Sequence, residues 1–279
     1  MLIANPIYDV VFKYLMANLD IAKGIISTII DEEIVTLDFK AQEGVDFIAK
    51  IKLKEGGYKN VLIELQKSNI PYDIERFRRY LGDQYKKVDD VPSESGEGES
   101  SKESLPIITI YFLGFSLSAT LPNVIKVGRQ YIDVLKGKEI TERSEFIERL
   151  THDSYVIQIP GLQVQLKNRL EYVLSVFQQE NFVDKTRHLK SYDYKTTDKL
   201  ILKILKQLEK AAADEHLHRQ LDLEEMALSE YENTFKHLER KLEEKDKVLE
   251  EKDKALEEKD KALEEKDKYI RELLKKLEE

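Results

Sequence analysis

The chain has 279 residues, of which 35% are charged, and its 45 Lys and Arg against 54 Asp and Glu leave a formal net charge of −9. This length allows one large domain or two small ones with a true hydrophobic core. Cysteine is absent, which excludes a disulfide framework, a thiolate nucleophile and a cysteine-ligated zinc or iron–sulfur site.

The N-terminal segment 7–30 carries apolar residues at helical spacing. It predicts one long helix, with Pro6 in the first turn and a break near Asn18. The segment lacks the basic start of a signal peptide, and no stretch of the chain approaches the roughly 18 uncharged apolar residues of a membrane helix. We therefore expect a cytoplasmic protein without membrane contact.

The next segments alternate between strand and helix patterns. A strand is predicted over 34–40, and two strands over 45–54 and 60–67 flank the turn sequence EGGYK as a hairpin. A helix follows over 72–87. Residues 89–105 are rich in Ser, Gly and Glu and predict a disordered loop.

The apolar run LPIITIYFLGF predicts a buried strand. Further elements are expected in this order: strand 124–134, helix 141–151, strand 154–159, and helices over 165–180 and 196–213. The fold class is α/β, with a mixed sheet flanked by helices.

Two acids stand out in the predicted hairpin. Alternate residues from Val45 to Leu53 are apolar, so Asp46 belongs to the polar face of its strand. Glu64 lies in NVLIELQ, which otherwise reads as a core strand. Burying an unpaired carboxylate is costly, so Glu64 requires a partner, for which a metal ion is one candidate.

The length of the hairpin loop decides whether these acids meet, because opposed residues of a hairpin share a face. A two-residue Gly56–Gly57 turn would pair Asp46 with Lys67 and turn Glu64 away. A loop with an odd number of residues could pair Asp46 with Glu64 or Gln66. The metal-site hypothesis therefore predicts an odd loop or a bulge, and converging carboxylates supply the oxygen ligands that Mg²⁺ prefers.

Four segments in order carry a family resemblance: YDVVFKYLMAN, the hairpin with Asp46 and IELQ, IERFRRYLGDQY, and LPIITIYFLGF. Over roughly residues 5–185 they resemble the PD-(D/E)XK nuclease superfamily, in particular the Rpn-type recombination-promoting nuclease and putative transposase branch. The resemblance implies a nuclease domain over 1–185 with a restriction-endonuclease-like core. It also implies Mg²⁺-dependent, or Mn²⁺-dependent, hydrolysis of DNA in recombination or mobile elements.

By this resemblance Asp46 and Glu64 are catalytic and ligate the metal, with the Leu65 carbonyl as a further ligand. Gln66 occupies the position where the superfamily carries lysine. A glutamine can orient the attacking water but supplies no positive charge. Residue 45 is valine where the superfamily's name-giving proline would stand.

Three further residues match the branch. Asp9 matches the acid of its first helix, and Arg76 with Tyr80 matches an R…Y pattern on the helix after the ExQ strand. The latter two could contact phosphate or brace the carboxylates.

Each of these residues also has a structural alternative. Asp46 and Glu64 could form ion pairs with strand lysines. Asp9 could complement a helix dipole as a first-turn acid. Arg76 could belong to a solvated helix face together with its neighbours Arg78 and Arg79.

The C-terminal segment 214–279 follows a helical connector over 186–213 and repeats LEEKDK with a period of seven. Nine apolar residues from Leu221 to Leu277 fall on heptad position a, which predicts a coiled coil and a homo-oligomer. Lysine occupies the d positions across the repeats, which weakens the seam. The alternative is a solvated single helix that acts as a spacer.

The net charge is distributed unevenly among these segments. Residues 1–88 are neutral overall, 89–105 carry −5, 106–213 carry +4 and 214–279 carry −8. A mildly basic body can therefore approach DNA through local, salt-sensitive contacts. Two functions remain: a metal-dependent DNA endonuclease, or a catalytically inactive nuclease-fold protein that acts as a coiled-coil scaffold or DNA-binding accessory.

Overall fold

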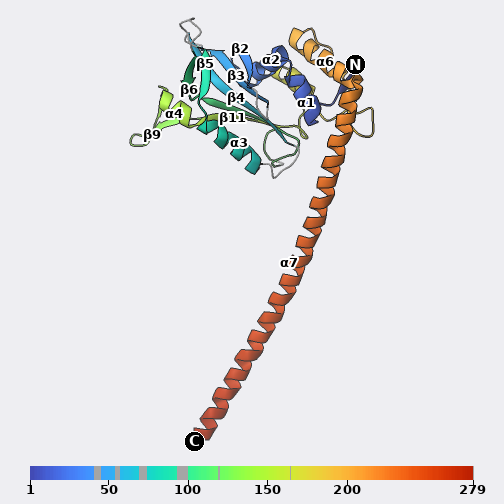
Figure 1. Ribbon diagram of the computed structural model, residues 1–279. Helices are drawn as coiled ribbons and strands as arrows, with labels where there is room; N and C mark the ends of the chain where they lie inside the picture. Colours follow the sequence, from blue (N-terminus) through green and yellow to red (C-terminus); the bar gives the residue numbers. More distant parts are fainter. Residues whose placement is uncertain are drawn as a thin grey trace. The chain divides into compact units, whose positions relative to one another are not determined.

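The computed structural model of the chain describes residues 1–40, 45–53, 57–68, 74–92, 100–118, 120–163 and 165–278 (Figure 1). It contains two compact units, Met1–Glu224 and Glu225–Glu279.

A six-stranded mixed sheet forms the centre of the first unit, in the order β2-β3-β4-β7-β11-β8. The strands are β2 (Ile34–Lys40), β3 (Val45–Lys52), β4 (Tyr58–Ser68), β7 (Ile107–Leu113), β8 (Val124–Val127) and β11 (His152–Gln158). β2, β3 and β4 form an antiparallel meander, β7 runs parallel to β4 and to β11, and β8 pairs antiparallel with β11. The predicted α/β class with a mixed sheet is confirmed.

Helices lie on both faces of this sheet (Figure 1). One side carries α1 (Asp9–Met16), α2 (Leu19–Ile30), α5 (Arg169–Ser175) and α6 (Lys199–Ala213), and the other side carries α3 (Ile74–Lys86). The main core lies on the first side, where the ring of Phe12 lies 5.1 Å from that of Phe112. On the second side, Phe77 of α3 lies 5.2 Å from Tyr111 of β7.

The N-terminal helix is broken where the sequence predicts. α1 ends at Met16 and α2 begins at Leu19, because the side chain of Asn18 caps α2 by accepting the Ile21 backbone N–H. The expected place of Pro6 in the first turn is wrong. The helix starts at Asp9, and Pro6 lies in the turn before it.

The predicted alternation of apolar and polar residues along β3 is also confirmed. Phe47, Ala49 and Ile51 are fully buried, as the apolar set of the strand requires. Phe47 opposes buried Ile63 of β4, and Ala49 opposes buried Val61. Because successive side chains of a strand point to opposite faces, Asp46 and Glu64 belong to the face on which α3 lies.

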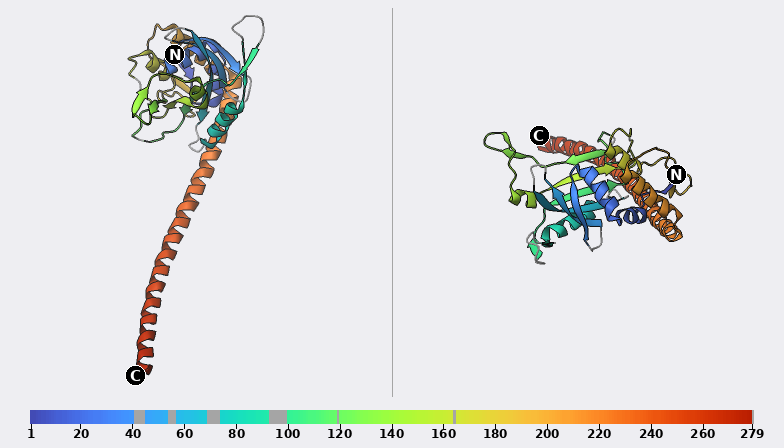
Figure 2. Two further views of the ribbon diagram at one scale, coloured as in Figure 1. Left: turned by 90° about the vertical axis from the view of Figure 1, so that its left-hand side faces the viewer. Right: turned by 90° about the horizontal axis from the view of Figure 1, so that it is seen from above.

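Short strands supplement the sheet. β5 (Asp89–Pro92) pairs with β6 (Ser100–Glu103), and Figure 2 shows this ribbon standing clear of the main sheet. The prediction of a disordered loop is thus wrong for these eight residues, which pair as an antiparallel hairpin. Residues 93–99 lie outside the described residues. β9 (Tyr131–Asp133) pairs with β10 (Lys138–Ile140), ahead of α4 (Glu145–Leu150).

The first unit extends beyond the expected end at residue 185. β12 (Leu189–Ser191) pairs with β1 (Leu2–Ala4), and α6 buries most of its apolar face in the main core. α7 (Glu215–Glu278) then starts within the same unit, where Leu217 and Leu221 are buried. Residues 186–224 therefore complete this core.

The second unit is the remainder of α7. Its heptad a residues Leu242, Leu249, Leu256, Leu263 and Ile270 are each more than half exposed in the single chain. None of the described helices is apolar over a length that could cross a membrane.

Candidate active site

The hairpin register brings the two predicted acids together. β3 and β4 are joined by the five residues 53–57, and in the resulting register Asp46 is the direct cross-strand partner of Glu64. The prediction of an odd-length loop is confirmed. Opposed residues in such a pair have Cβ atoms about 4.5–5.5 Å apart. The side chains of Asp46, Glu64 and Gln66 lie outside the described residues, so their placement rests on the backbone.

A row of polar residues continues from this pair across the sheet. Glu64 is paired with Thr109 of β7, which is paired with Ser154 of β11. Thr109 is fully buried, and its hydroxyl donates to the Ser154 hydroxyl at 2.8 Å. These two residues are not among the predicted site residues. The available indication was a threonine within the apolar run PIITIYFL.

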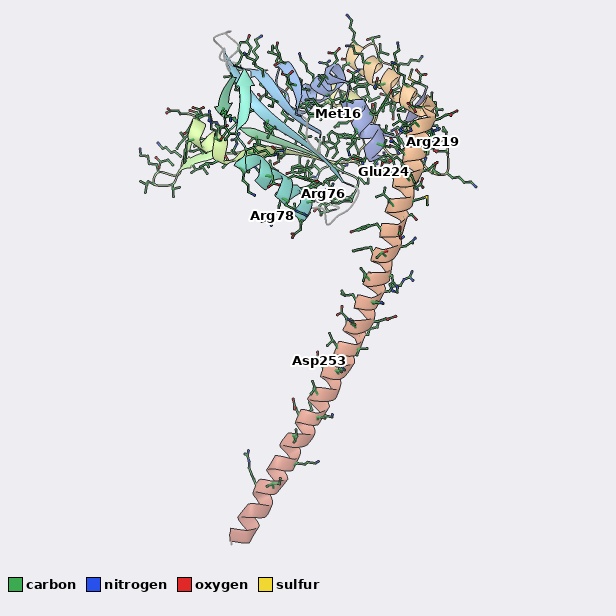
Figure 3. All side chains as sticks on the ribbon, in the orientation of Figure 1. Met16, Arg76, Arg78, Arg219, Glu224 and Asp253 are labelled. Carbon is green, nitrogen blue, oxygen red and sulfur yellow. The ribbon has the colours of Figure 1, made fainter. Side chains whose placement is uncertain are left out.

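Arg76 lies at the end of the ExQ strand. It extends from α3 (Figure 3). Its guanidinium donates to the carbonyl of Lys67, one residue after Gln66, at 3.2 Å and lies over the ring of Phe77. Arg76 therefore braces the β4 backbone. Tyr80 is half-buried on the same helix, and Arg78 and Arg79 are exposed, as a solvated helix face predicts.

Asp9 is held in contacts on the opposite face of the sheet. Its carboxylate lies 2.7 Å from Lys13, one turn along α1, and its backbone N–H donates to Glu224 at 2.6 Å. These contacts match the alternative of a first-turn acid at a helix N-terminus. No described contact links Asp9 to the Asp46–Glu64 pair.

Lys67 is a buried cation at the end of the same strand. Its side chain is 4% exposed, with Nζ 3.9 Å from Glu224 Oε1. Burial lowers the pKa of Lys67, and the neighbouring carboxylates of Glu224 and Asp9 oppose that shift without cancelling it. In the sequence Lys67 stands out only as the residue that a two-residue turn would pair with Asp46.

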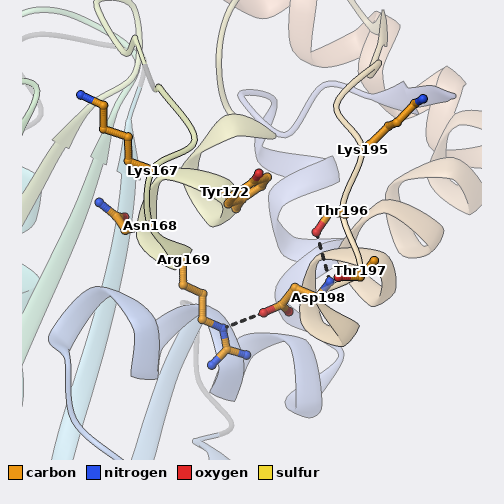
Figure 4. A pocket seen from close by; sticks show the side chains of 8 residues that line it. All are labelled: Lys167, Asn168, Arg169, Tyr172, Lys195, Thr196, Thr197 and Asp198. Atoms are coloured by element: carbon orange, nitrogen blue, oxygen red, sulfur yellow. Dashed lines mark hydrogen bonds and ion pairs between the residues drawn. The ribbon is translucent and has the colours of Figure 1, made fainter.

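A cavity of about 480 Å³ lies apart from these residues, where α5 and α6 begin (Figure 4). It is lined by Lys167, Asn168, Arg169, Tyr172, Lys195, Thr196, Thr197 and Asp198. Asp198 caps α6 and pairs with the Arg169 guanidinium at 3.2 Å, so one of the three cations is already neutralised. None of the lining residues is a predicted site residue.

The described side chains do not include those of Asp46 and Glu64. That set holds no group of three or more His, Asp or Glu able to hold an ion. The donor chemistry of the hairpin pair nevertheless fits a hard divalent cation, because two carboxylates on adjacent strands share one face.

Comparisons with known proteins add no assignment. No family model, no curated protein and no solved structure matches the chain.

Proposed function

We propose that the chain is a metal-dependent DNA endonuclease of the PD-(D/E)XK superfamily, acting in the cytoplasm in recombination or on mobile elements. The observation that carries the proposal is the register that opposes Asp46 and Glu64 across the β3–β4 hairpin. The element order adds support, since α1, the hairpin, α3 and β7 carry, in the same order, the four segments that resemble the family.

In this proposal Asp46, Glu64 and the Leu65 carbonyl would hold Mg²⁺ or Mn²⁺. The bound ion would lower the pKa of a water and stabilise charge on a phosphoryl oxygen. Gln66 lies on the same strand face as Glu64, so its amide would orient the attacking water. Because glutamine is neutral, stabilisation of the phosphoryl charge would depend on the ion.

The supporting residues take indirect roles. Arg76 braces the backbone beyond Gln66, which leaves phosphate contact to cations that face solvent. Tyr80 would line the same side of the sheet from α3. For Asp9, the described contacts favour a structural role, and its inclusion in the site rests on the family resemblance alone.

A second candidate is a catalytically inactive scaffold or DNA-binding accessory that assembles through α7. The observation that favours it is the row of exposed heptad a residues, which would be buried in a coiled coil. The neutral Gln66, at the position where the superfamily carries lysine, also favours a catalytically inactive protein.

A supercoiled-plasmid nicking assay separates the two functions. The wild-type chain should nick in Mg²⁺ and stop in EDTA, while Asp46→Asn and Glu64→Gln should lower the rate by at least about 100-fold. Asp38→Asn is the matched control, since Asp38 is exposed on neighbouring β2 and faces Ile48 in the register. Equal nicking by Asp46→Asn would refute the site. Failure of the wild type with every divalent metal would favour the scaffold.

A further inference from the structure

One carboxylate joins three separate elements of the first unit. Glu224, in the third turn of α7, accepts the Asp9 N–H through Oε1 at 2.6 Å and the Val10 N–H through Oε2 at 3.1 Å. It thereby neutralises the positive end of α1, where free N–H groups favour an anion. The same Oε1 lies 3.9 Å from Lys67 Nζ. Figure 3 shows Glu224 beside α1.

Lys67 is held from both faces of the sheet. Its side chain points to the α1 face and ends at Glu224, while its carbonyl accepts the guanidinium of Arg76 from α3. Its backbone also pairs with Phe112 of β7. The residue directly before it is Gln66, whose side chain belongs to the α3 face by alternation.

The ion pair joins a buried lysine to a partly buried glutamate, since the side chain of Lys67 is 4% exposed and that of Glu224 is 18% exposed. Removing the lysine from water costs free energy, and replacing such a pair by apolar side chains of similar volume is often neutral or stabilising. Such pairs are retained in some proteins because they specify one geometry. Here the pair lies at the carboxyl end of β4.

We propose that Lys67 and Glu224 are positioning residues, which fix the end of β4 so that Glu64 and Gln66 keep their orientation on the α3 face. This role rests on the proposed endonuclease. It makes the first turns of α7 part of the catalytic unit, in keeping with a compact unit that ends at Glu224. Displacing a catalytic group by about 1 Å can cost up to 100-fold in rate.

The test uses the full chain with Lys67→Met, Glu224→Gln and the double variant. Lys210→Met on α6 and Glu215→Gln on α7 are controls, because both side chains are exposed in the same unit. Plasmid-nicking kinetics and thermal unfolding are measured for each. Both single variants should lower kcat roughly 10- to 100-fold with KM changed by less than about twofold, and the controls should match the wild type.

The double variant separates positioning from stability. With neither charge left buried alone, its melting temperature should recover toward that of the wild type. Its kcat should stay low, because the contact that places the strand end is still missing. Recovery of kcat together with the melting temperature would overturn the proposal, as would single variants with wild-type kcat.

Hydrogen exchange gives a measurement that needs no activity. The amides of residues 64–68 should exchange faster in all three variants and at the wild-type rate in both controls. If the wild-type chain nicks no DNA, the endonuclease proposal fails, and exchange still reports whether the pair holds the strand. Unchanged exchange at residues 64–68 would overturn the positioning role.

Discussion

Asp46 on β3 and Glu64 on β4 are direct cross-strand partners, so two acids oppose each other on one face of the sheet. Like charges placed in this way repel each other and destabilise a hairpin unless a cation lies between them.

The repulsion gives the first prediction. In EDTA, Asp46→Asn should raise the free energy of unfolding by about 0.2–1 kcal/mol, because it removes one of two like charges. In Mg²⁺ the wild type should gain stability and the variant should not, since binding to the native state alone stabilises it. Urea unfolding in the two buffers measures both effects, with Asp38→Asn as the control. A variant less stable than the wild type in EDTA would instead indicate ion pairs with strand lysines.

The second prediction concerns Arg129, which joins β11 to α4. Its guanidinium lies 2.9 Å from Asp153 and 2.8 Å from Glu148, and the side chain is 17% exposed. Arg129→Met should cost about 1–3 kcal/mol at pH 7, because it leaves two partly buried carboxylates without their shared partner. Arg143→Met, at an arginine that is half exposed and 4.0 Å from Glu148, should cost no more than about 1 kcal/mol.

The Arg129 contact also predicts a pH dependence. Burial acts to raise the pKa of Asp153, but the Arg129 guanidinium outweighs it and holds that pKa below its usual value of 3.8. A lowered carboxyl pKa stabilises the fold above the usual value, and this stability is lost as pH falls through the lowered one. The cost of Arg129→Met should therefore shrink between pH 4 and pH 2 in urea unfolding. A cost independent of pH would contradict the pairing.

The third prediction concerns Lys190, whose ammonium group is buried and donates to the carbonyls of Val176, at 2.8 Å, and Gln178. Burial lowers its pKa to about 8, with Glu180 opposing the shift. The unfolded lysine binds its proton more tightly, so stability rises with pH between about 8 and the usual value of 10.5.

The rise should be measurable against a variant without the amine. From pH 7 to pH 9 the wild type should gain about 1 kcal/mol relative to Lys190→Met in urea unfolding. Lys185→Met, at an exposed lysine nearby, should not change the pH profile. A wild type that loses stability relative to Lys190→Met over this range would contradict the lowered pKa.

The fourth prediction concerns the second unit. If the exposed a residues form a coiled coil, light scattering should give a multiple of the 32.6 kDa chain mass, and Leu249→Asp with Leu256→Asp should reduce it to one chain. Lys247→Asp, at an outward f position, should leave the mass unchanged. A one-chain mass for the wild type would favour the solvated spacer helix.

Local patterns were enough for much of the architecture. The alternation in β3 correctly placed Phe47, Ala49 and Ile51 in the core, and the capping side chain of Asn18 marked the break between α1 and α2. These features depend on neighbours a few residues away, so their cause is visible in the sequence. The same reasoning failed for β5 and β6, where composition predicts disorder but backbone pairing forms a hairpin.

The candidate site depended on information of longer range. The sequence by itself determined that Asp46 and Glu64 lie in one hairpin. Whether the two acids face each other then depended on whether the loop has an odd or an even number of residues. Only the tertiary structure decided that the number is odd, because the five residues 53–57 join the two strands. It also placed Thr109 beside Glu64 and brought Glu224 to Lys67 from 157 residues away. Such contacts form because packing of the whole core pays the entropy of closing long loops, and no short stretch of sequence contains that balance.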